Sequence, residues 1–309
     1  MKKVAIIIST YNQKELLLQS ITSLNKTNYS NFEIFVVDDS GKGKIGKEIK
    51  NKFSGINVII NNVNKGFSGG YNTGIRLAIK EYDPDYILVL NDDIEILDKN
   101  WLRELIEIGE KREDVGIIGC KILYSDKTIQ NMGGYIKGWK IDSICNEKDL
   151  PLYIDKISPY NVDYVMGAFM LIKKEVIIDI GVFDEIFNPY LLEDTDYCLR
   201  AKNVGWNILS VPSVKIIHKK GKSIDSSTDE AKRLLVRFKN DIIFSRRHLK
   251  GWDKYFRIFI YLPFVAIFRK ENDTDKLQLK NFILRNTPLK NLWMWFIAFW
   301  PSLYKEKIK

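Results

Sequence analysis

The stretch YILVLNDD, residues 86–93, shows the pattern on which the predicted fold depends. Its first five residues, Tyr86–Leu90, are aromatic or aliphatic, and Asn91, Asp92 and Asp93 follow directly. A short, continuous apolar run of this kind is typical of a β-strand that is buried on both faces. The polar residues then mark the point where the chain leaves the sheet.

The same arrangement occurs earlier in the chain. Apolar runs at Val4–Ser9, Phe32–Val37 and Val58–Ile60 predict three more strands. Between them, apolar residues recur with helical spacing at residues 16–24, and a further helix is expected at 71–80. Strands that alternate with helices predict an α/β fold, in which a mostly parallel sheet is covered by helices on both faces.

The pattern is less regular after about residue 115. Tyr164–Lys173 is a strand candidate, and Glu193–Val204 begins with acidic residues and continues as a helix. Asn207–His218 contains two short apolar runs around Pro212. Residues 229–249 have the spacing of an amphipathic helix with a basic outer face.

Composition limits the class of protein. The chain has 309 residues, of which 45% are hydrophobic and 28% charged, as expected of a globular protein. Its three cysteines, Cys120, Cys145 and Cys198, form no CxxC pair, which argues against a disulfide scaffold and favours a reducing, cytoplasmic setting. The apolar run after Lys2 and Lys3 is too short for a signal peptide and favours a strand.

Positive charge is concentrated at one end of the chain. The net charge is +9, yet residues 1–225 hold 30 basic and 31 acidic residues, whereas residues 226–309 hold 18 and 8. We therefore expect two parts with different partners, a domain at residues 1–225 and a basic, aromatic, helical region at residues 226–309.

The strand ends predict a binding site. Carboxyl ends of parallel strands meet at one edge, where α/β proteins bind ligands, so Tyr11, Asp39 and Asp93 are expected in one crevice. A carboxylate together with an imidazole such as His218 suits a hard divalent ion that also binds substrate phosphates and water. Each residue alone has an ordinary explanation as a turn or helix-end residue. Their joint arrangement favours the site.

A glycine-rich turn, Lys65–Gly70, leads into the helix predicted at residues 71–80. Backbone amides at the start of such a helix can face an anion. The turn matches neither the P-loop nor the dinucleotide-binding fingerprint, which argues against a kinase-like NTPase or a dehydrogenase.

Seven segments, taken in order, resemble a known family. They are Ser9–Asn12 (STYN), Val36–Ser40 (VVDDS), Asn64–Asn72 (NKGFSGGYN), Leu90–Asp93 (LNDD), Gly167–Ile172 (GAFMLI), Glu193–Asp196 (EDTD), and Val211–Pro212 with His218. As a set they resemble family 2 glycosyltransferases, and most of all the rhamnosyltransferase-like members that build bacterial or archaeal surface polysaccharides. The resemblance covers residues 1–225 and implies the GT-A nucleotide-diphospho-sugar transferase fold with a C-terminal helical extension.

The resemblance implies a nucleotide-binding role for five positions. Thr10 and Tyr11 look like the segment that lines the nucleobase. Asp39 resembles the carboxylate that accepts a hydrogen bond from the base N3–H, a donor that uracil and thymine share. Asn72 resembles the residue at the helix start near the nucleotide, and Asp92 belongs to the motif that follows the fourth strand.

It also implies the metal ligands and the catalytic base. Asp93 stands where the family has the metal-binding carboxylate of its DXD-type motif, although the first Asp of a strict DXD is Asn91 here. His218 resembles the distal metal ligand. Asp194 resembles the catalytic base at a helix N-terminus, with Glu193 beside it.

The implied activity is an inverting, metal-dependent sugar transfer. A UDP- or dTDP-sugar would donate rhamnose or a similar hexose to a hydroxyl of a glycan or lipid-linked acceptor. Mg²⁺ or Mn²⁺ would neutralise the departing diphosphate, and Asp194 would accept the proton of the attacking hydroxyl.

Two runs near the C-terminus, residues 258–268 and 291–304, carry no charge. They are shorter than the ~20 residues that cross a bilayer. Their aromatic residues and basic flanks favour contact with an anionic membrane surface, so the protein is expected at the inner face of the cell membrane. The alternative is that both runs pack on the catalytic domain or form a homodimer contact.

Two other functions remain open at this point. A nucleotidyltransferase would want a glycine-rich, basic loop after the first strand, where this chain has Ser9–Asn12. A nucleic-acid binder could use the basic region at residues 226–309, with salt-sensitive phosphate contacts. The aromatic residues there cluster in apolar runs instead of alternating with Lys and Arg, so no nucleic-acid partner is expected.

Overall fold

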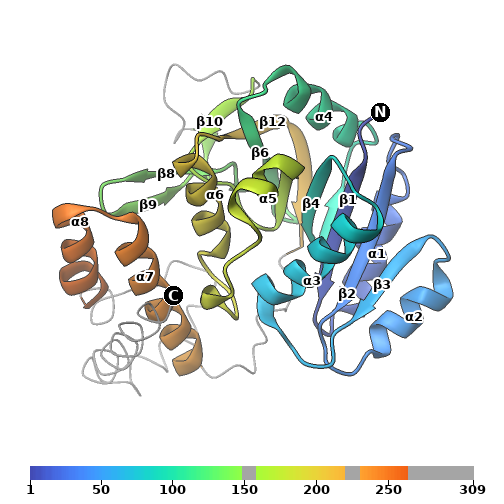
Figure 1. The fold of residues 1–309 in the computed structure, drawn as a ribbon, viewed down its shortest axis with the longest axis horizontal. Coiled ribbons are helices and arrows are strands. Elements are labelled where there is room, and N and C mark those ends of the chain that lie inside the picture. Colours follow the sequence, from blue (N-terminus) through green and yellow to red (C-terminus); the bar gives the residue numbers. More distant parts are fainter. Residues whose placement is uncertain (148–157, 220–229, 264–309) are drawn as a thin grey trace. The chain divides into compact units, whose positions relative to one another are not determined.

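The computed structural model describes residues 1–147, 158–219 and 230–263 (Figure 1). The chain divides into two compact units. Unit 1 comprises Met1–Ile136 and Ile141–Asp225, and unit 2 comprises Lys137–Lys140 and Ser226–Lys309. Each unit has a hydrophobic core of its own within the described residues.

A ten-stranded sheet forms the centre of unit 1. Its strands are β1 (Val4–Thr10), β2 (Phe32–Asp38), β3 (Ile56–Ile60), β4 (Tyr86–Asn91), β5 (Ile94–Ile96), β6 (Val115–Leu123), β7 (Ile129–Asn131), β10 (Tyr160–Val162), β11 (Phe169–Lys173) and β12 (Asn207–His218). The order across the sheet is β10-β12-β6-β11-β4-β1-β2-β3, with β5 paired to β12 and β7 to β6. A separate hairpin consists of β8 (Gly134–Lys137) and β9 (Lys140–Ser143).

Six strands of the sheet, β1, β2, β3, β4, β6 and β12, run in the same direction. β3, β2, β1 and β4 are parallel, and so are β6 and β12. β11 is antiparallel to both β4 and β6, which gives β6 the direction of β4. The carboxyl ends of β1, β2, β4 and β12 therefore lie at one edge of the sheet.

Helices cover both faces, as the sequence predicts. The helices of unit 1 are α1 (Lys14–Leu24), α2 (Lys44–Lys52), α3 (Gly66–Glu81), α4 (Trp101–Lys111), α5 (Lys174–Ile180) and α6 (Glu193–Asn203). Ile6 and Ile8 of β1 belong to a core cluster with α1, α2 and α4, whereas Ile7 belongs to a second cluster with α3, α5 and α6. Alternate residues of one buried strand thus face two helical layers.

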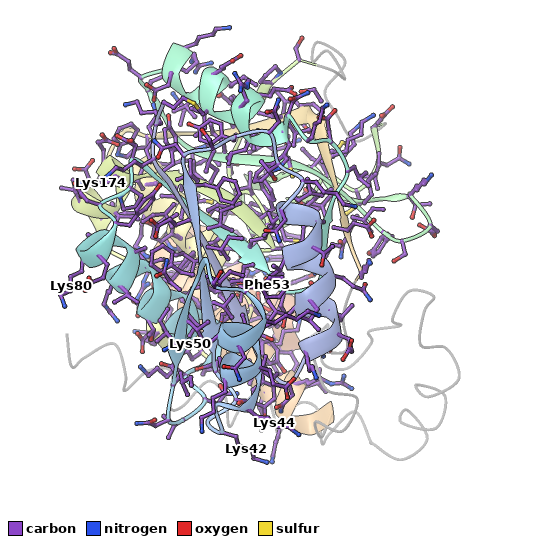
Figure 2. All side chains as sticks on the ribbon, turned by 90° about the vertical axis from the view of Figure 1, so that its right-hand side faces the viewer. Lys42, Lys44, Lys50, Phe53, Lys80 and Lys174 are labelled. Atoms are coloured by element: carbon purple, nitrogen blue, oxygen red, sulfur yellow. The ribbon has the colours of Figure 1, made fainter. Side chains whose placement is uncertain are left out.

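Helix α2 illustrates how the sequence sorts residues between core and solvent. Ile45 and Ile49, four residues apart, are buried against the sheet. Lys44 and Lys50 are exposed, as is Lys42 in the preceding loop (Figure 2). The helix is therefore held by one apolar stripe, and its outer face is basic.

Glycines bring α3 close to β1. A Cβ atom at Gly74 would lie 2.4 Å from Cγ2 of Ile7, and one at Gly70 would lie 2.4 Å from Oγ of Ser9. Any larger residue would push the helix away from the sheet. This close approach sets the start of α3 beside the carboxyl end of β1.

One strand prediction needs correction. β11 begins at Phe169 and not at Tyr164, because the Gly167 amide donates to the Asp194 side chain at 2.8 Å instead of to a strand. The two apolar runs around Pro212 both belong to one strand, β12. The register of β12 against β6 shifts between Val211 and Lys215, where Pro212 lacks an amide hydrogen for the ladder.

Unit 2 contains α7 (Glu230–His248), α8 (Gly251–Phe256) and a π-helical turn at Arg257–Tyr261. Its core is formed by Phe238, Ile242 and Leu262. None of the helices in the described part of the chain is both long enough and apolar enough to cross a bilayer. The predicted run at residues 291–304 and the end of the run at 258–268 lie outside the described residues.

Candidate active site

The carboxyl ends of β1, β2 and β4 are level with one another. Thr10 pairs with Asp38 across β1 and β2, and Ser9 pairs with Asn91 across β1 and β4. The residues that leave these strands therefore start from one edge of the sheet. This register explains why side chains that are distant in the sequence interact there.

Thr10 and Asp92 form the first such contact. The Thr10 hydroxyl donates a hydrogen bond of 2.6 Å to Oδ2 of Asp92, and both residues are buried. Burial raises the pKa of Asp92 to about 7, the hydrogen bond from Thr10 opposes this shift, and the charge of Asp93 adds to it. Tyr11, the next residue after β1, is 41% exposed.

Asp39 fixes the start of the glycine-rich turn. Its buried carboxylate accepts a 2.7 Å hydrogen bond from the Asn61 side chain and bonds of 3.1 and 3.0 Å from the Lys65 amide. Burial raises the pKa of Asp39, and these hydrogen bonds oppose the rise. The Lys65 amide is one donor shared between the two oxygens, so the donors are Asn61, Lys65 and the Gly66 amide. Two carboxylate oxygens have about four acceptor positions, which leaves capacity for one more donor.

Asp93 and His218 come together although 124 residues separate them. Oδ1 of Asp93 lies 3.0 Å from Nε2 of His218, and both side chains are largely buried. Strand pairing is the cause, because His218 at the end of β12 pairs with Ile94, the residue that follows Asp93. The Lys219 amide also donates to the Asp93 carbonyl at 3.0 Å. The prediction that these two residues share one side of the molecule is confirmed.

The hydrogen bonds of His218 bear on whether this pair fits a cation. Its Nδ1 lies 2.9 Å from Oε1 of Gln130, an acceptor, so in the neutral ring Nδ1 carries the hydrogen. Nε2 is then an acceptor, and it lies 3.0 Å from Oδ1 of Asp93 and 3.3 Å from Nδ2 of Asn91. Two acceptor atoms at that distance repel each other unless a proton or a metal ion lies between them.

The donor set therefore fits a divalent ion. A carboxylate oxygen and an imidazole nitrogen both ligate Mn²⁺, and Gln130 is the kind of partner that orients a ligating imidazole. Within residues 1–147, 158–219 and 230–263, no three His, Cys, Asp or Glu side chains converge in a metal-binding group. The remaining ligands would thus come from substrate and water.

Asp194 is held in place at the start of α6. Its carboxylate accepts hydrogen bonds from the Gly167 amide at 2.8 Å, the Thr195 amide at 2.6 Å and the Thr195 hydroxyl at 3.1 Å. Burial is the main reason that the pKa of Asp194 is raised, and the three hydrogen bonds limit the rise. A Cβ atom at Gly167 would lie 2.9 Å from the Phe67 ring, so glycine permits this approach.

Asp194 lies at the same edge as the Asp93–His218 pair. Gly167 immediately precedes Ala168, whose carbonyl accepts a 3.0 Å hydrogen bond from the Asn91 amide at the end of β4. The Asn91 side chain in turn lies 3.3 Å from Nε2 of His218. A continuous chain of hydrogen bonds and adjacent residues thus connects Asp194 to His218.

The side chain of Asn72 is engaged elsewhere. It is fully buried, donates to the Phe183 carbonyl at 2.9 Å and to Glu185 at 3.0 Å, and accepts from the Phe183 amide at 3.0 Å. In this structure it therefore ties α3 to the segment before α6. Its contact with a nucleotide stays a prediction.

Sequence reasoning did not assign roles to several residues at this edge. Tyr71, which is 1% exposed, donates to the Leu90 carbonyl at 2.9 Å and lies 3.0 Å from Oδ1 of Asn91. Glu193 is 5% exposed, and no described residue makes a hydrogen bond to its Oε2. The glycine-rich turn and the acidic helix start were the available signals for these two residues, whereas Gln130 had none.

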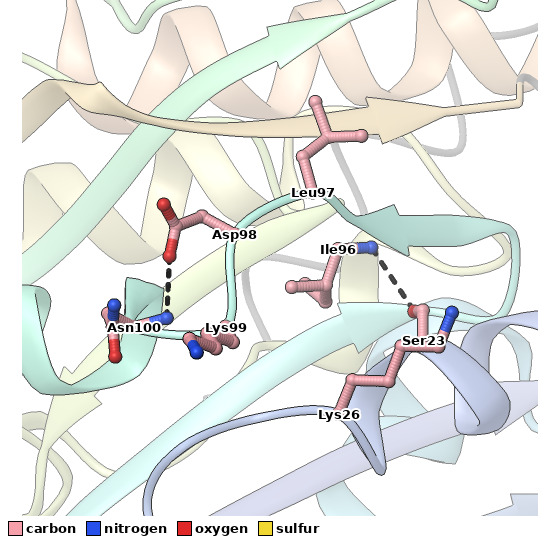
Figure 3. A pocket seen from close by; sticks show the side chains of 7 residues that line it. All are labelled: Ser23, Lys26, Ile96, Leu97, Asp98, Lys99 and Asn100. Carbon is pink, nitrogen blue, oxygen red and sulfur yellow. Dashed lines mark hydrogen bonds between the residues drawn. The ribbon is translucent and has the colours of Figure 1, made fainter.

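A surface pocket lies elsewhere on unit 1. It is lined by Ser23, Lys26 and Ile96–Asn100, where the Ile96 amide donates to Oγ of Ser23 at 3.1 Å (Figure 3). None of the predicted site residues lines it. The pocket therefore belongs to a different part of the surface.

Comparison with known proteins identifies the family of this fold. Residues 5–181 match the family model described as "Glycosyl transferase family 2", which is more than half of the chain. Asp194 and His218 lie beyond the matched segment. The structure connects these two residues to the strand ends inside it.

Three relatives show how far the similarity extends. The chain is 26% identical to the uncharacterized protein y4gI of Sinorhizobium fredii over 87% of its own length, but covers only 30% of that protein. It is 31% identical to the low-salt glycan biosynthesis hexosyltransferase Agl10 of Haloferax volcanii, over 69% of this chain and 66% of the relative. It is 20% identical to the N-acetylglucosaminyl-diphospho-decaprenol L-rhamnosyltransferase of Mycobacterium tuberculosis, over 80% and 85%.

Two solved structures share the fold. The mannosyltransferase PcManGT from Pyrobaculum calidifontis, in complex with GDP-Man and Mn²⁺, superposes with a TM-score of 0.55 at 11% identity, covering 99% of this chain and 87% of its own. GalNAc-T7 with UDP, GalNAc and Mn²⁺ gives a TM-score of 0.61 at 16% identity, covering 94% of this chain and 56% of the GalNAc-T7 chain. At this level of identity the likeness confirms the predicted GT-A fold and carries no ligand over to this chain.

Proposed function

The chain belongs to glycosyl transferase family 2, and from this premise we propose that it transfers rhamnose or a similar hexose from a UDP- or dTDP-sugar to a hydroxyl group. The acceptor is a glycan or a lipid-linked sugar in the synthesis of a surface polysaccharide. The observation that carries the proposal is the 3.0 Å approach of Asp93 to His218 at the edge where Asp194 is also held. The names of the Haloferax hexosyltransferase and the mycobacterial rhamnosyltransferase support the substrate class.

The donor nucleotide binds along the ends of β1 and β2. Tyr11, which is partly exposed, contacts the base, and Asp39 uses its remaining acceptor capacity for the base N3–H. Thr10 and Asp92 act together, since their hydrogen bond fixes the loop that presents Asp93. Asn72 supports the nucleotide site through the start of α3, since its side-chain hydrogen bonds go to Phe183 and Glu185.

Asp93 and His218 hold a divalent cation, Mg²⁺ or Mn²⁺. Such an ion neutralises charge on a departing diphosphate when it is bound. The chain contributes the positioning, because Gln130 orients the imidazole and the pairing of β5 with β12 sets the separation of the two ligands. Their fixed arrangement limits the reorganisation that binding would otherwise require.

Asp194 is the general base of a single displacement with inversion. The acceptor hydroxyl attacks the anomeric carbon, the bond from that carbon to the diphosphate oxygen breaks, and the hydroxyl proton passes to the Asp194 carboxylate. Burial makes this carboxylate more basic than an exposed one, which favours proton transfer near neutral pH. The three hydrogen bonds to the carboxylate keep it oriented.

Donor binding tests this function directly. The thermal shift of the full chain is measured with UDP-, dTDP- and GDP-sugars, in the presence of Mn²⁺ and again in EDTA. We expect stabilisation by a UDP- or dTDP-sugar that EDTA abolishes and that Asp93→Asn weakens. Asp126→Asn is a matched control, because this exposed carboxylate only closes a local turn. The absence of stabilisation by every nucleotide sugar would contradict the proposal.

The proposed place of action is the cytoplasmic face of the cell membrane. A lipid-linked acceptor would be found there, and the basic balance of residues 226–309 suits anionic lipid. A homodimer contact through the same region is the alternative partner.

A further inference from the structure

The clearest unexplained surface in the described part of unit 2 is an aromatic face on α8 and the turn that follows it. Trp252, Tyr255, Phe259 and Ile260 are 72%, 52%, 50% and 48% exposed. Their spacing of three, four and one residues places them along one side of a helix. We call these four side chains the aromatic face.

The opposite side of the same segment is buried. Ile258 and Leu262 are 3% and 2% exposed, and Arg257 is 6% exposed. The Arg257 guanidinium donates to Oδ1 of Asp241 at 2.5 Å and to the Trp139 carbonyl at 2.6 Å. The segment is thus anchored by one side, and that anchoring fixes the direction in which the aromatic face points. Within the described part of this apolar run, Ile258 and Leu262 are therefore not available for contacts outside unit 2.

Charge close to the aromatic face in the sequence is mostly positive. Between Arg246 and Lys254 the chain holds four basic residues and one acidic residue, Asp253. Lys254 lies over the Tyr255 ring, with its ammonium group 5.1 Å from the ring centroid. Aromatic rings flanked by lysine are suited to the boundary between lipid headgroups and acyl chains.

We propose that the aromatic face docks on an anionic bilayer surface, with Trp252, Tyr255 and Phe259 entering the headgroup layer and the neighbouring basic residues binding lipid phosphates. A second copy of the chain fits less well, because two such faces would bring like charges together. Nucleic acid also fits less well, because the aromatic side chains form one continuous apolar face. This inference deepens the proposed location and rests on it, since a lipid-linked acceptor is what makes docking useful.

Vesicle binding tests the inference. Co-sedimentation of the full chain is measured with phosphatidylcholine vesicles and with vesicles that also contain phosphatidylglycerol, without nucleotide sugar or metal. We expect binding to the anionic vesicles, and a loss of about tenfold or more in the partition coefficient for Trp252→Ala with Phe259→Ala. Ile178→Ala is the matched control, since Ile178 is 71% exposed on α5 of unit 1, and it should bind as the wild type does.

A second pair of variants separates charge from apolar contact. Lys250→Gln with Lys254→Gln should reduce the preference for anionic vesicles and its sensitivity to salt. Wild-type binding that is equal for the two vesicle types, or aromatic variants that bind like the wild type, would overturn the inference. So would sedimentation showing a dimer that the aromatic variants convert to monomer. Donor binding by thermal shift is measured on the same variants, so a failure of docking is distinct from a failure of the proposed activity.

Discussion

Asp194 combines two properties that a general base needs. Burial raises its pKa, and hydrogen bonds from Gly167 and Thr195 orient its carboxylate. Asp194→Asn keeps the shape of the side chain but removes its ability to accept a proton. We expect turnover to fall by about 10²–10⁴-fold with donor binding retained.

Initial rates and calorimetric titration of the donor measure these two quantities. Asp126→Asn serves again as the control carboxylate on the surface. A variant with near-normal turnover would remove Asp194 from the chemistry. A variant that loses donor binding would assign it a binding role instead.

The hydroxyl of Thr195 leads to a prediction about the pKa of Asp194. Its hydroxyl donates to the Asp194 carboxylate and lowers the carboxylate pKa, partly offsetting the effect of burial. Thr195→Val removes this donor at similar volume, so the pKa of Asp194 should rise and the base should stay protonated to higher pH. We expect the acidic limb of the pH profile of kcat/KM to move upward, with little change at high pH. An unmoved limb would show that another group controls it.

Glu193 is a buried acid with an oxygen that none of the described residues satisfies. Burial raises its pKa well above the ordinary value, and the charge of Asp194 adds to the rise. The folded protein therefore keeps the proton while the unfolded chain releases it above its ordinary value of 4.5. The resulting stability is complete at low pH and is lost as pH rises.

Glu193→Gln should remove this pH dependence, because glutamine stays neutral in both states. We expect the free energy of unfolding, measured with urea at pH 5 and pH 8, to fall less with pH in the variant than in the wild type. Equal pH slopes for the two proteins would mean that Glu193 is ionised in the folded state.

Among the elements, the C-terminal helices depend on a buried ion pair. Arg257 and Asp241 are 6% and 5% exposed and are joined by a 2.5 Å hydrogen bond between α7 and the π-helical turn. Asp241→Ala would leave the Arg257 guanidinium buried without its counter-charge, a change that costs about 3–5 kcal/mol.

Arg112 and Asp114 provide the matched control. They form a 2.7 Å pair with side chains 43% and 47% exposed, so Asp114→Ala should cost less than about 1 kcal/mol. Amide hydrogen exchange in α7 and α8 reports the local effect in unit 2. Equal protection of these helices in wild type and Asp241→Ala would contradict the prediction.

The elements also show which features the sequence can predict. The strands β1, β2 and β4 can be predicted from local sequence, since each is a mainly apolar run that ends in polar residues. The start of β11 was not predictable, because residues 164–172 are largely apolar and the Gly167 amide bonds to Asp194, which is distant in the sequence. The register shift of β12 against β6 near Pro212 likewise becomes visible only in the strand pairing.

The candidate site was predicted unevenly for a related physical reason. Residues at strand ends can be grouped from topology alone, and Asp93 with His218 is the example that the structure bears out. The partners of Asn72 and His218 depend on long-range packing, in which Phe183 and Gln130 come from segments with no pattern of their own. These contacts are therefore visible only in the folded structure.

At the scale of the whole molecule, all the predicted site residues lie in unit 1. The two core clusters of unit 1 lie between its sheet and its helices. The small cluster of Phe238, Ile242 and Leu262 belongs to unit 2. Stability and donor binding in unit 1 should therefore not require residues 226–309. The fragment of residues 1–225 is the test of this separation.

We expect this fragment to fold and to bind the donor sugar nucleotide with the affinity of the full chain. Truncation exposes Trp139. In the full chain its ring contacts Phe256 and Tyr261, with ring centroids 4.9 and 4.6 Å away, and the fragment lacks both partners. Trp139→Ser in the fragment removes the apolar surface that would otherwise promote association. Far-UV circular dichroism measures folding, and thermal shift with Mn²⁺ and the donor measures binding. A folded fragment that no longer binds the donor would place part of the donor site in residues 226–309, and an unfolded fragment would show that the core of unit 1 does not stand alone.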